Sequence, residues 1–190
     1  MDAHNTPTLT KECQTCKLMI MTSSVNHEET YNFFKSNNFF GGEESSFVFF
    51  SQSSLPAVDP EGKIIMKSPY EIQLAPNGNG ALFDSIKNNQ MVADLIRSSK
   101  YVQVIGVDNV LNKVLDPLQV GYMSAKSLDA SLKVCPKADA AEKVGVVCKK
   151  NGIYDIVEYS EISEEDCTRK AEDGSLFLEL GSILIFMLSS

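Results

Sequence analysis

Residues 71–87, read as EIQLAPNGNGALFDSIK, place an apolar run, a glycine-rich turn and a second apolar run in succession. Glycine adopts positive φ at little steric cost, and asparagine and proline favour tight turns. The pattern predicts a strand over Glu71–Leu74 and one or two helices over Ala81–Ser98. A strand, a turn and a helix in this order are typical of α/β folds.

The rest of the chain continues this alternation. Further strands are predicted over 18–21, 47–50, 101–107, 144–148 and 153–159, and a further helix over 28–35. Asn151-Gly152 lies between the last two strands and is a strong hairpin signal, while Gly62-Lys63 predicts a second, polar turn. We therefore expect an α/β layered fold with a mixed, mainly parallel sheet and an antiparallel hairpin.

Composition limits the possible partners. The chain has 190 residues, 43% of them hydrophobic, which favours one domain with one buried core. We expect this domain over 18–190, after a poorly ordered lead-in over 1–17. A formal net charge of −8 argues against nucleic acid or an anionic membrane as the main partner.

Targeting signals are also missing from the sequence pattern. The N-terminal residues lack the basic, apolar and small-residue order of a secretory signal. The late apolar run Ile183–Leu188 is far shorter than the roughly 18 residues of a membrane span. Five cysteines without a signal peptide favour a reducing, cytoplasmic location. Cys13 and Cys16 have metal or redox spacing, but no second ligand pair accompanies them, so we expect two free thiols.

Three predicted strands end in residues that could bind a ligand. Phe50 is followed by Ser51-Gln52, Leu74 by the glycine-rich turn, and Val107 by Asp108-Asn109. Ligands bind beyond the carboxyl ends of parallel strands, so these ends would converge on one crevice if the strands are neighbours. The residue types alone leave simpler readings open, since the turn could be only a connection and Asp108 only a helix N-cap.

Six collinear motifs carry a family resemblance from about Leu18 to Gly181. They read IMTS, FF-x-Q-x-x-LPA, AP-x-GNG, VDN, VGVV and VEYSEI, and lie at 20–23, 49–57, 75–80, 107–109, 144–147 and 157–162. In this order the sequence closely resembles the eukaryotic UDP-N-acetylglucosamine (UDP-N-acetylhexosamine) pyrophosphorylase family. The VEYSEI motif favours the N-acetylhexosamine branch over the glucose branch.

The resemblance implies a Rossmann-like, GT-A-like nucleotidyltransferase fold and a uridylyltransferase activity. UTP and N-acetylglucosamine 1-phosphate would give UDP-N-acetylglucosamine and pyrophosphate, by in-line attack of the sugar phosphate on the α-phosphorus. Such catalysis depends on positioning and on charge neutralisation at phosphate oxygens.

The resemblance also assigns roles to residues. Gln52 and the Gly78 backbone would hold uracil, and Asn79 would contact the sugar nucleotide. Asp108 would bind Mg²⁺ between phosphates, as a hard carboxylate oxygen can. Gly145, Glu158 and Tyr159 would form the sugar pocket, although the residue type alone makes Glu158 an ordinary solvated charge.

The sequence also departs from the family pattern. The family's GGxGTRLG loop and its following lysine, which hold the triphosphate, have no counterpart before IMTS, because residues 1–17 contain no glycine. Ser182 stands where the family has a substrate-contacting asparagine, and similarity is lost after Gly181. Asn77 replaces the usual aspartate in the turn, and Ala81 a usual glycine. We therefore expect a catalytic domain incomplete at both ends and little activity from the isolated chain.

Two other functions remain open at this stage. The first is a non-catalytic nucleotide-sugar-binding or partner-binding protein that keeps the uracil and sugar pockets. The second is a pyrophosphorylase for another sugar phosphate, such as N-acetylgalactosamine or glucose 1-phosphate, because the motifs do not determine the orientation of a single hydroxyl.

Overall fold

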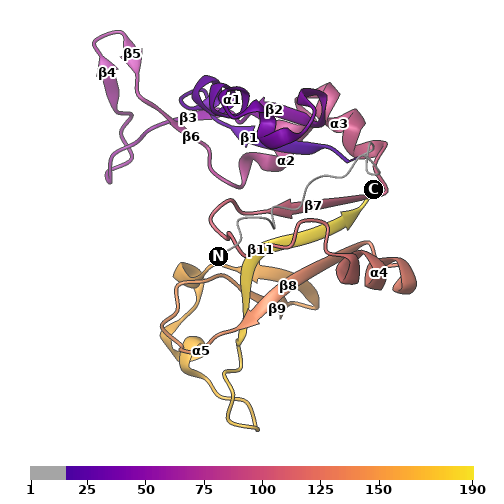
Figure 1. The fold of residues 1–190 in the computed structure, drawn as a ribbon. Coiled ribbons are helices and arrows are strands. Elements are labelled where there is room, and N and C mark those ends of the chain that lie inside the picture. The colour runs from indigo at the N-terminus through magenta and orange to yellow at the C-terminus, as the bar shows by residue number, and fades with distance from the viewer. Residues whose placement is uncertain (1–15) are drawn as a thin grey trace, which may run out of the picture. The chain divides into compact units, whose positions relative to one another are not determined.

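The computed structural model describes residues 16–190 (Figure 1). They fall into two units, one ending at Ile96 and the other running from Arg97 to Ser190, whereas length alone favoured one domain. Each unit has its own strand pairings and its own buried side chains. The predicted lead-in lies almost wholly outside the described residues. No helix in the described part is long and apolar enough to cross a membrane.

The first unit alternates strands and helices, as its sequence predicts. Its elements are β1 (Leu18–Thr22), α1 (His27–Ser36), β2 (Phe47–Ser51), β3 (Ser54–Pro56), β4 (Met66–Ser68), β5 (Glu71–Ile72), β6 (Leu74–Pro76), α2 (Ala81–Lys87) and α3 (Gln90–Arg97). Two short 3-10 turns, η1 (Asn38–Gly41) and η2 (Glu44–Ser46), connect α1 to β2.

Aromatic packing joins α1 to the parallel pair of β1 and β2. The Phe34 ring on α1 lies edge-on to Phe47 and Phe49 of β2, with centroid distances of 5.5 and 5.2 Å. It also meets Phe40 of η1 at 5.2 Å. Edge-to-face pairs add to the stabilisation from burial. This packing holds η1 although both Phe39 and Phe40 have positive φ, at 46° and 53°, which is strained for bulky residues.

An exposed arm leaves the first unit between β3 and β6. These two strands pair antiparallel, with Ser54 opposite Pro76, and β4 and β5 form a second antiparallel pair farther out (Figure 1). The predicted strand over Glu71–Leu74 is divided at Gln73, whose backbone bonds to Ala57 and Ile65. The polar turn predicted at Gly62-Lys63 lies in this arm, where Gly62 has a φ of 81°.

The second unit contains the longest strand. Its elements are β7 (Tyr101–Ile105), α4 (Pro117–Lys126), β8 (Ala130–Pro136), β9 (Val146–Lys150), β10 (Ile153–Val157), η3 (Tyr159–Glu161), α5 (Glu164–Thr168) and β11 (Leu180–Ser189). The hairpin predicted at Asn151-Gly152 is confirmed, with Ile153 opposite Lys150. Helix α4 and strands β8 and β11 were not predicted.

Strand β11 is the centre of the five-stranded sheet. It pairs antiparallel with β8 from Leu180 to Leu188, with β7 from Ile185 to Ser189, and with β9 at Gly181. Its alternate residues Gly181, Ile185 and Met187 are buried. The register against β8 shifts between Ser182 and Ile185, where Leu184 has a φ of 52°. This β-bulge separates residues 185–189 of β11, which pair with β7, from Gly181, which pairs with β9.

The expected mainly parallel sheet is not found among the described residues. Only β1 and β2 pair in parallel, and the other strand pairs are antiparallel. Apolar runs predict buried strands but do not give their direction. The antiparallel arrangement here follows from the hairpin of β9 and β10 and from the return of β11 between earlier strands.

A partly buried ion pair joins α4 to β8. Asp116 is the N-cap of α4, and its carboxylate accepts hydrogen bonds from the Leu118 backbone amide and from the Lys133 ammonium of β8. Asp116 is 8% exposed. The Lys133 ammonium, followed by the Leu118 amide, lowers the pKa of the Asp116 carboxyl because both stabilise its charged form.

One cysteine prediction is wrong. Cys16 is disulfide-bonded, whereas the sequence led us to expect a free thiol. A Cys-x-x-Cys spacing is compatible with free thiols and with an oxidised pair, so the sequence left open whether this pair is oxidised. Cys13 lies outside the described residues. The cysteines free of disulfides in the described part are Cys135, Cys148 and Cys167.

We expect Phe34→Ala to lower the free energy of unfolding by about 3 kcal/mol, because it removes a ring packed against four others. Urea unfolding followed by far-ultraviolet circular dichroism measures the change. Tyr70→Ala is the control, since Tyr70 is 99% exposed and its loss should change stability by less than about 0.5 kcal/mol. Equal effects of the two substitutions would contradict the packing described here.

We expect Asp116→Asn to be destabilising near pH 7 and progressively less so in acid. A lowered folded-state pKa means that the carboxylate contributes stability above its unfolded pKa of about 3.9, and that this contribution is lost as the pH falls through the folded value. Asparagine keeps the N-cap, so the comparison isolates the charge. Unfolding free energies of both proteins between about pH 2 and pH 7 test this; a difference that does not vary with pH would exclude it.

Candidate functional site

The first part of the candidate site lies where β2 ends. The Gly78 amide donates to Gln52 Oε1 at 2.7 Å, and the Gln52 amide donates to the Thr22 carbonyl at 2.8 Å. Gly78 has a φ of 80°, a conformation that strains other residues, which explains the glycine in this turn. The sequence-based expectation that Gln52 and the glycine-rich turn lie together is therefore confirmed. Asn79 follows in the turn and is exposed.

A polar network anchors this end of the sheet. His27 Nδ1 lies 2.7 Å from Thr22 Oγ1 and 3.1 Å from Ser51 Oγ. Thr22 Oγ1 also donates to the Phe50 carbonyl at 3.1 Å. Thr22 is 3% exposed, so this network fixes the residue immediately before Gln52 from inside the unit. Sequence reasoning noted Ser51 at the end of its strand but gave no role in the site to His27, because this histidine stands in no recognisable spacing.

The second part of the candidate site lies where β9 and β11 meet. The Ser182 amide donates to the Gly145 carbonyl at 2.7 Å. A Cβ placed on Gly145 would lie 3.1 Å from Ile156 Cγ2 and 3.4 Å from Glu158 Oε1. The Glu158 carboxylate therefore lies beside the Gly145 backbone, and a larger residue at position 145 would press mainly against Ile156. The structure thus brings Gly145, Glu158 and Ser182 together.

Tyr159 and Asp108 follow strands β10 and β7 of the second unit. Tyr159 begins η3 and is 45% exposed, and the Glu161 amide donates to the Glu158 carbonyl at 2.9 Å. Asp108 is exposed in the loop that follows β7. This strand ends at Ile105, two residues earlier than predicted.

Strand β11 connects the Asp108 loop to the Gly145 edge. The Gly106 amide donates to the Leu184 carbonyl at 3.0 Å, two residues along β11 from the bond between Ser182 and Gly145. Asn112 Nδ2 donates to the Gly106 carbonyl at 3.1 Å and stabilises the loop. The loop with the predicted metal ligand and the edge with the predicted sugar pocket are therefore bonded to residues two apart on one strand. Sequence reasoning missed this role of Leu184.

Asp108, the predicted metal ligand, is a single exposed carboxylate. No group of three or more histidine, cysteine, aspartate or glutamate residues that could hold a metal ion occurs in residues 16–190. Mg²⁺ in phosphate-transferring sites keeps several waters and is held by one or two carboxylates together with substrate phosphates. A lone exposed carboxylate fits that pattern, and it does not fit a site built from protein ligands alone.

Comparison with known proteins identifies the family of this chain. Residues 5–180 match the family described as "UTP--glucose-1-phosphate uridylyltransferase". The chain is 41% identical over 169 residues to a protein of Dictyostelium discoideum named "Probable UDP-N-acetylglucosamine pyrophosphorylase", which covers 87% of this chain and 35% of that protein. The chain therefore spans about a third of the length of this curated relative.

Solved structures give the same result. The crystal structure of a putative UDP-N-acetylglucosamine pyrophosphorylase from Entamoeba histolytica has a TM-score of 0.81 and 33% identity, over 91% of this chain and 43% of that one. A UDP-glucose phosphorylase from Trypanosoma brucei has a TM-score of 0.70 at 18% identity, over 91% of this chain and 39% of that one, and so shares the fold alone. The chain belongs to the UTP--glucose-1-phosphate uridylyltransferase family, and within that family it resembles the UDP-N-acetylglucosamine pyrophosphorylases.

Proposed function

We propose that this chain supplies the uracil-binding and sugar-binding parts of a uridylyltransferase that makes UDP-N-acetylglucosamine from UTP and N-acetylglucosamine 1-phosphate. The observation that carries the proposal is that the motif residues form two organised sets. Gln52 bonds to Gly78 in the first unit, and Glu158 lies beside Gly145 in the second. Family membership supports the same activity.

The reaction transfers a uridylyl group between phosphates. An oxygen of the sugar phosphate attacks the α-phosphorus of UTP, a new P–O bond forms, and the bond to the pyrophosphate leaving group breaks. The protein has little covalent chemistry to perform, so its work is to align the two substrates and to stabilise charge.

Each set of residues has its own task in the proposal. Gln52 and the Gly78 amide orient uracil, and Asn79 contacts the nucleotide beyond it. The Gly145 backbone and the Glu158 carboxylate bind sugar hydroxyls, with Tyr159 beside them. Hydrogen bonds to a charged acceptor such as Glu158 are stronger than those between neutral groups.

Asp108 would hold Mg²⁺ in this proposal. When bound, the ion would offset the phosphate charges, which the net charge of −8 would otherwise repel. The Asp108 carboxylate has no hydrogen-bond or ion-pair partner among residues 16–190, so it is available to a cation.

Two measurements on the purified chain test the overall function. The first is pyrophosphate release from UTP and N-acetylglucosamine 1-phosphate in the presence of magnesium. The second is equilibrium binding of UDP-N-acetylglucosamine. Binding with turnover supports the transferase. Binding without turnover is expected if the chain supplies only the uracil-binding and sugar-binding parts, and the absence of both binding and turnover rejects the proposal. Competition with the galactosamine and glucose counterparts determines the sugar preference.

We expect Asp108→Asn to abolish the effect of magnesium on UDP-N-acetylglucosamine binding. Removing the charge of the only proposed protein ligand should weaken magnesium-dependent binding by about tenfold or more. Calorimetric titration with and without magnesium measures this. The control is Asp129→Asn, another exposed aspartate of the second unit. A magnesium effect retained in Asp108→Asn would remove Asp108 from the metal site.

We expect Glu158→Gln to weaken binding of UDP-N-acetylglucosamine by about tenfold while leaving UDP binding unchanged, because the carboxylate is assigned to sugar hydroxyls. Parallel titrations with the two ligands separate the sugar contribution from that of the nucleotide. Glu172→Gln, an exposed glutamate of the same unit, is the matched control. An equal loss for both ligands would argue against a role in sugar recognition.

A further inference from the structure

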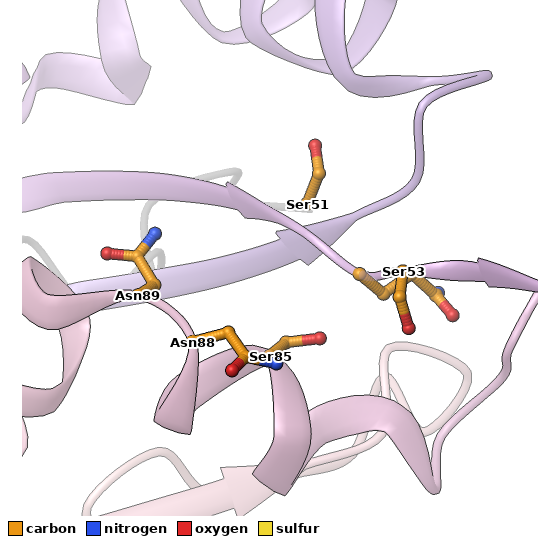
Figure 2. A pocket seen from close by; sticks show the side chains of 6 residues that line it. Ser51, Ser53, Ser85, Asn88 and Asn89 are labelled. Atoms are coloured by element: carbon orange, nitrogen blue, oxygen red, sulfur yellow. The ribbon is translucent and has the colours of Figure 1, made fainter.

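Three buried side-chain atoms have no hydrogen-bond partner among the described residues, and each needs a physical explanation. The Ser85 hydroxyl belongs to a side chain that lines a polar cavity of about 250 Å³ beside Gln52, in the uracil-binding part of the proposed site (Figure 2). Gln119 Oε1 belongs to a side chain of α4 whose Nε2 group bonds to a serine hydroxyl of β8 at 3.0 Å. The third atom, Asn112 Oδ1, lies in the loop that carries Asp108.

Asn112 bonds to the chain on both sides of Asp108. Its side-chain Nδ2 donates to the Gly106 carbonyl at 3.1 Å, and its backbone amide donates to the Asn109 carbonyl at 3.1 Å. Gly106 precedes Asp108 by two residues, and Asn109 follows it directly. The Asp108 carboxylate has no partner of its own within residues 16–190, so its position depends on these two flanking residues.

The two ends of the loop are attached to the sheet without the Asn112 side chain. At one end, the Gly106 amide bonds to β11. At the other end, Gln103 Oε1 accepts from the Leu115 amide at 2.6 Å, and Gln103 Nε2 donates to the Lys113 carbonyl at 3.3 Å. The Asn112 side chain therefore adds a bond across the loop, between two ends that are already fixed.

The stability of the fold alone does not explain an asparagine at position 112. Its Oδ1 atom is buried without a partner among the described residues, and such a group costs free energy. Leucine has a similar size and no polar side-chain atom, so it would remove both this unpaired oxygen and the bond to the Gly106 carbonyl. These two changes oppose each other in the free energy of unfolding. The position of the loop is therefore the better explanation for the asparagine.

We propose that Asn112 is a positioning residue for Asp108, and that its bond across the loop sets the strength of magnesium-dependent nucleotide binding. The inference rests on the proposed function, which assigns Mg²⁺ to Asp108. Residues 16–190 hold no cluster of three metal-binding side chains that could fix the ion, so the loop backbone has to fix the carboxylate. A carboxylate held in place before binding loses less conformational freedom when it meets the ion.

The experiment measures binding of UDP-N-acetylglucosamine to the 190-residue chain by calorimetric titration, with and without magnesium. We expect Asn112→Leu to weaken binding about fivefold when magnesium is present and to leave binding without magnesium unchanged. Val110→Ala is the matched control, because Val110 lies in the same loop, is 89% exposed and takes no part in the bond. This control should bind like the unaltered chain under both conditions.

Amide hydrogen exchange and urea unfolding distinguish the position of the loop from the stability of the fold. In Asn112→Leu we expect the Leu111 amide, which bonds to Asn109 Oδ1 within the loop, to exchange about fivefold faster. The Gly106 amide, which bonds to β11, should keep its rate, and the free energy of unfolding should not fall. Faster exchange at Gly106 together with a lower free energy of unfolding would show a general structural role and overturn the inference.

The outcomes also separate this inference from the proposed function. An unchanged magnesium effect in Asn112→Leu, with the effect lost in Asp108→Asn, overturns the inference alone. Equal weakening of binding with and without magnesium in Asn112→Leu does the same. A magnesium effect retained in Asp108→Asn removes the ion from this loop, and the inference then fails together with that part of the proposed function.

Discussion

Two backbone hydrogen bonds to β11 organise the second unit. The Ser182 amide holds the Gly145 carbonyl, and the Leu184 carbonyl holds the Gly106 amide. The β-bulge at these residues lets one edge of one strand serve two different neighbours. Gly106 is a glycine at a close approach, because a Cβ there would come within 2.9 Å of Leu184 Cδ2. The loop carrying Asp108 and the edge carrying Gly145 therefore depend on one short length of backbone.

The first unit reaches a comparable order through side chains. A histidine, a threonine and a serine bond to one another at the carboxyl ends of β1 and β2, and this network precedes Gln52 directly. Aromatic rings cover the other end of the same two strands and hold α1 against them. The polar network and the aromatic packing together make this strand pair rigid. Gln52 therefore follows a rigid element, and precise orientation of a planar base requires such support.

Much of this arrangement is predictable from residues that carry a local signal. Apolar runs gave β1, β2 and β7, Asn151-Gly152 gave the hairpin, and the glycine-rich turn gave the position of Gly78 beside Gln52. The direction and centre of the larger sheet were not predictable in this way. The apolar run at Ile183–Leu188 was recognised as too short for a membrane span, but its place between β7 and β8 depends on pairing across about 80 residues. Ser85 is not predictable as a buried, unpaired hydroxyl, because the sequence shows only a serine one helical turn after an alanine. The absence of a hydrogen-bond partner among the described residues is known only from the structure.

The bond between Gln52 and Gly78 has a consequence for how any ligand enters. The two groups assigned to the same base satisfy each other in the free protein, so a ligand that takes the Gly78 amide must displace the Gln52 oxygen. Binding there becomes an exchange of one hydrogen bond for another, with little net gain from the amide itself. The affinity must then come from polar groups that have no hydrogen-bond partner before the ligand binds. In the free protein, the bond between Gln52 and Gly78 keeps the turn in its observed conformation.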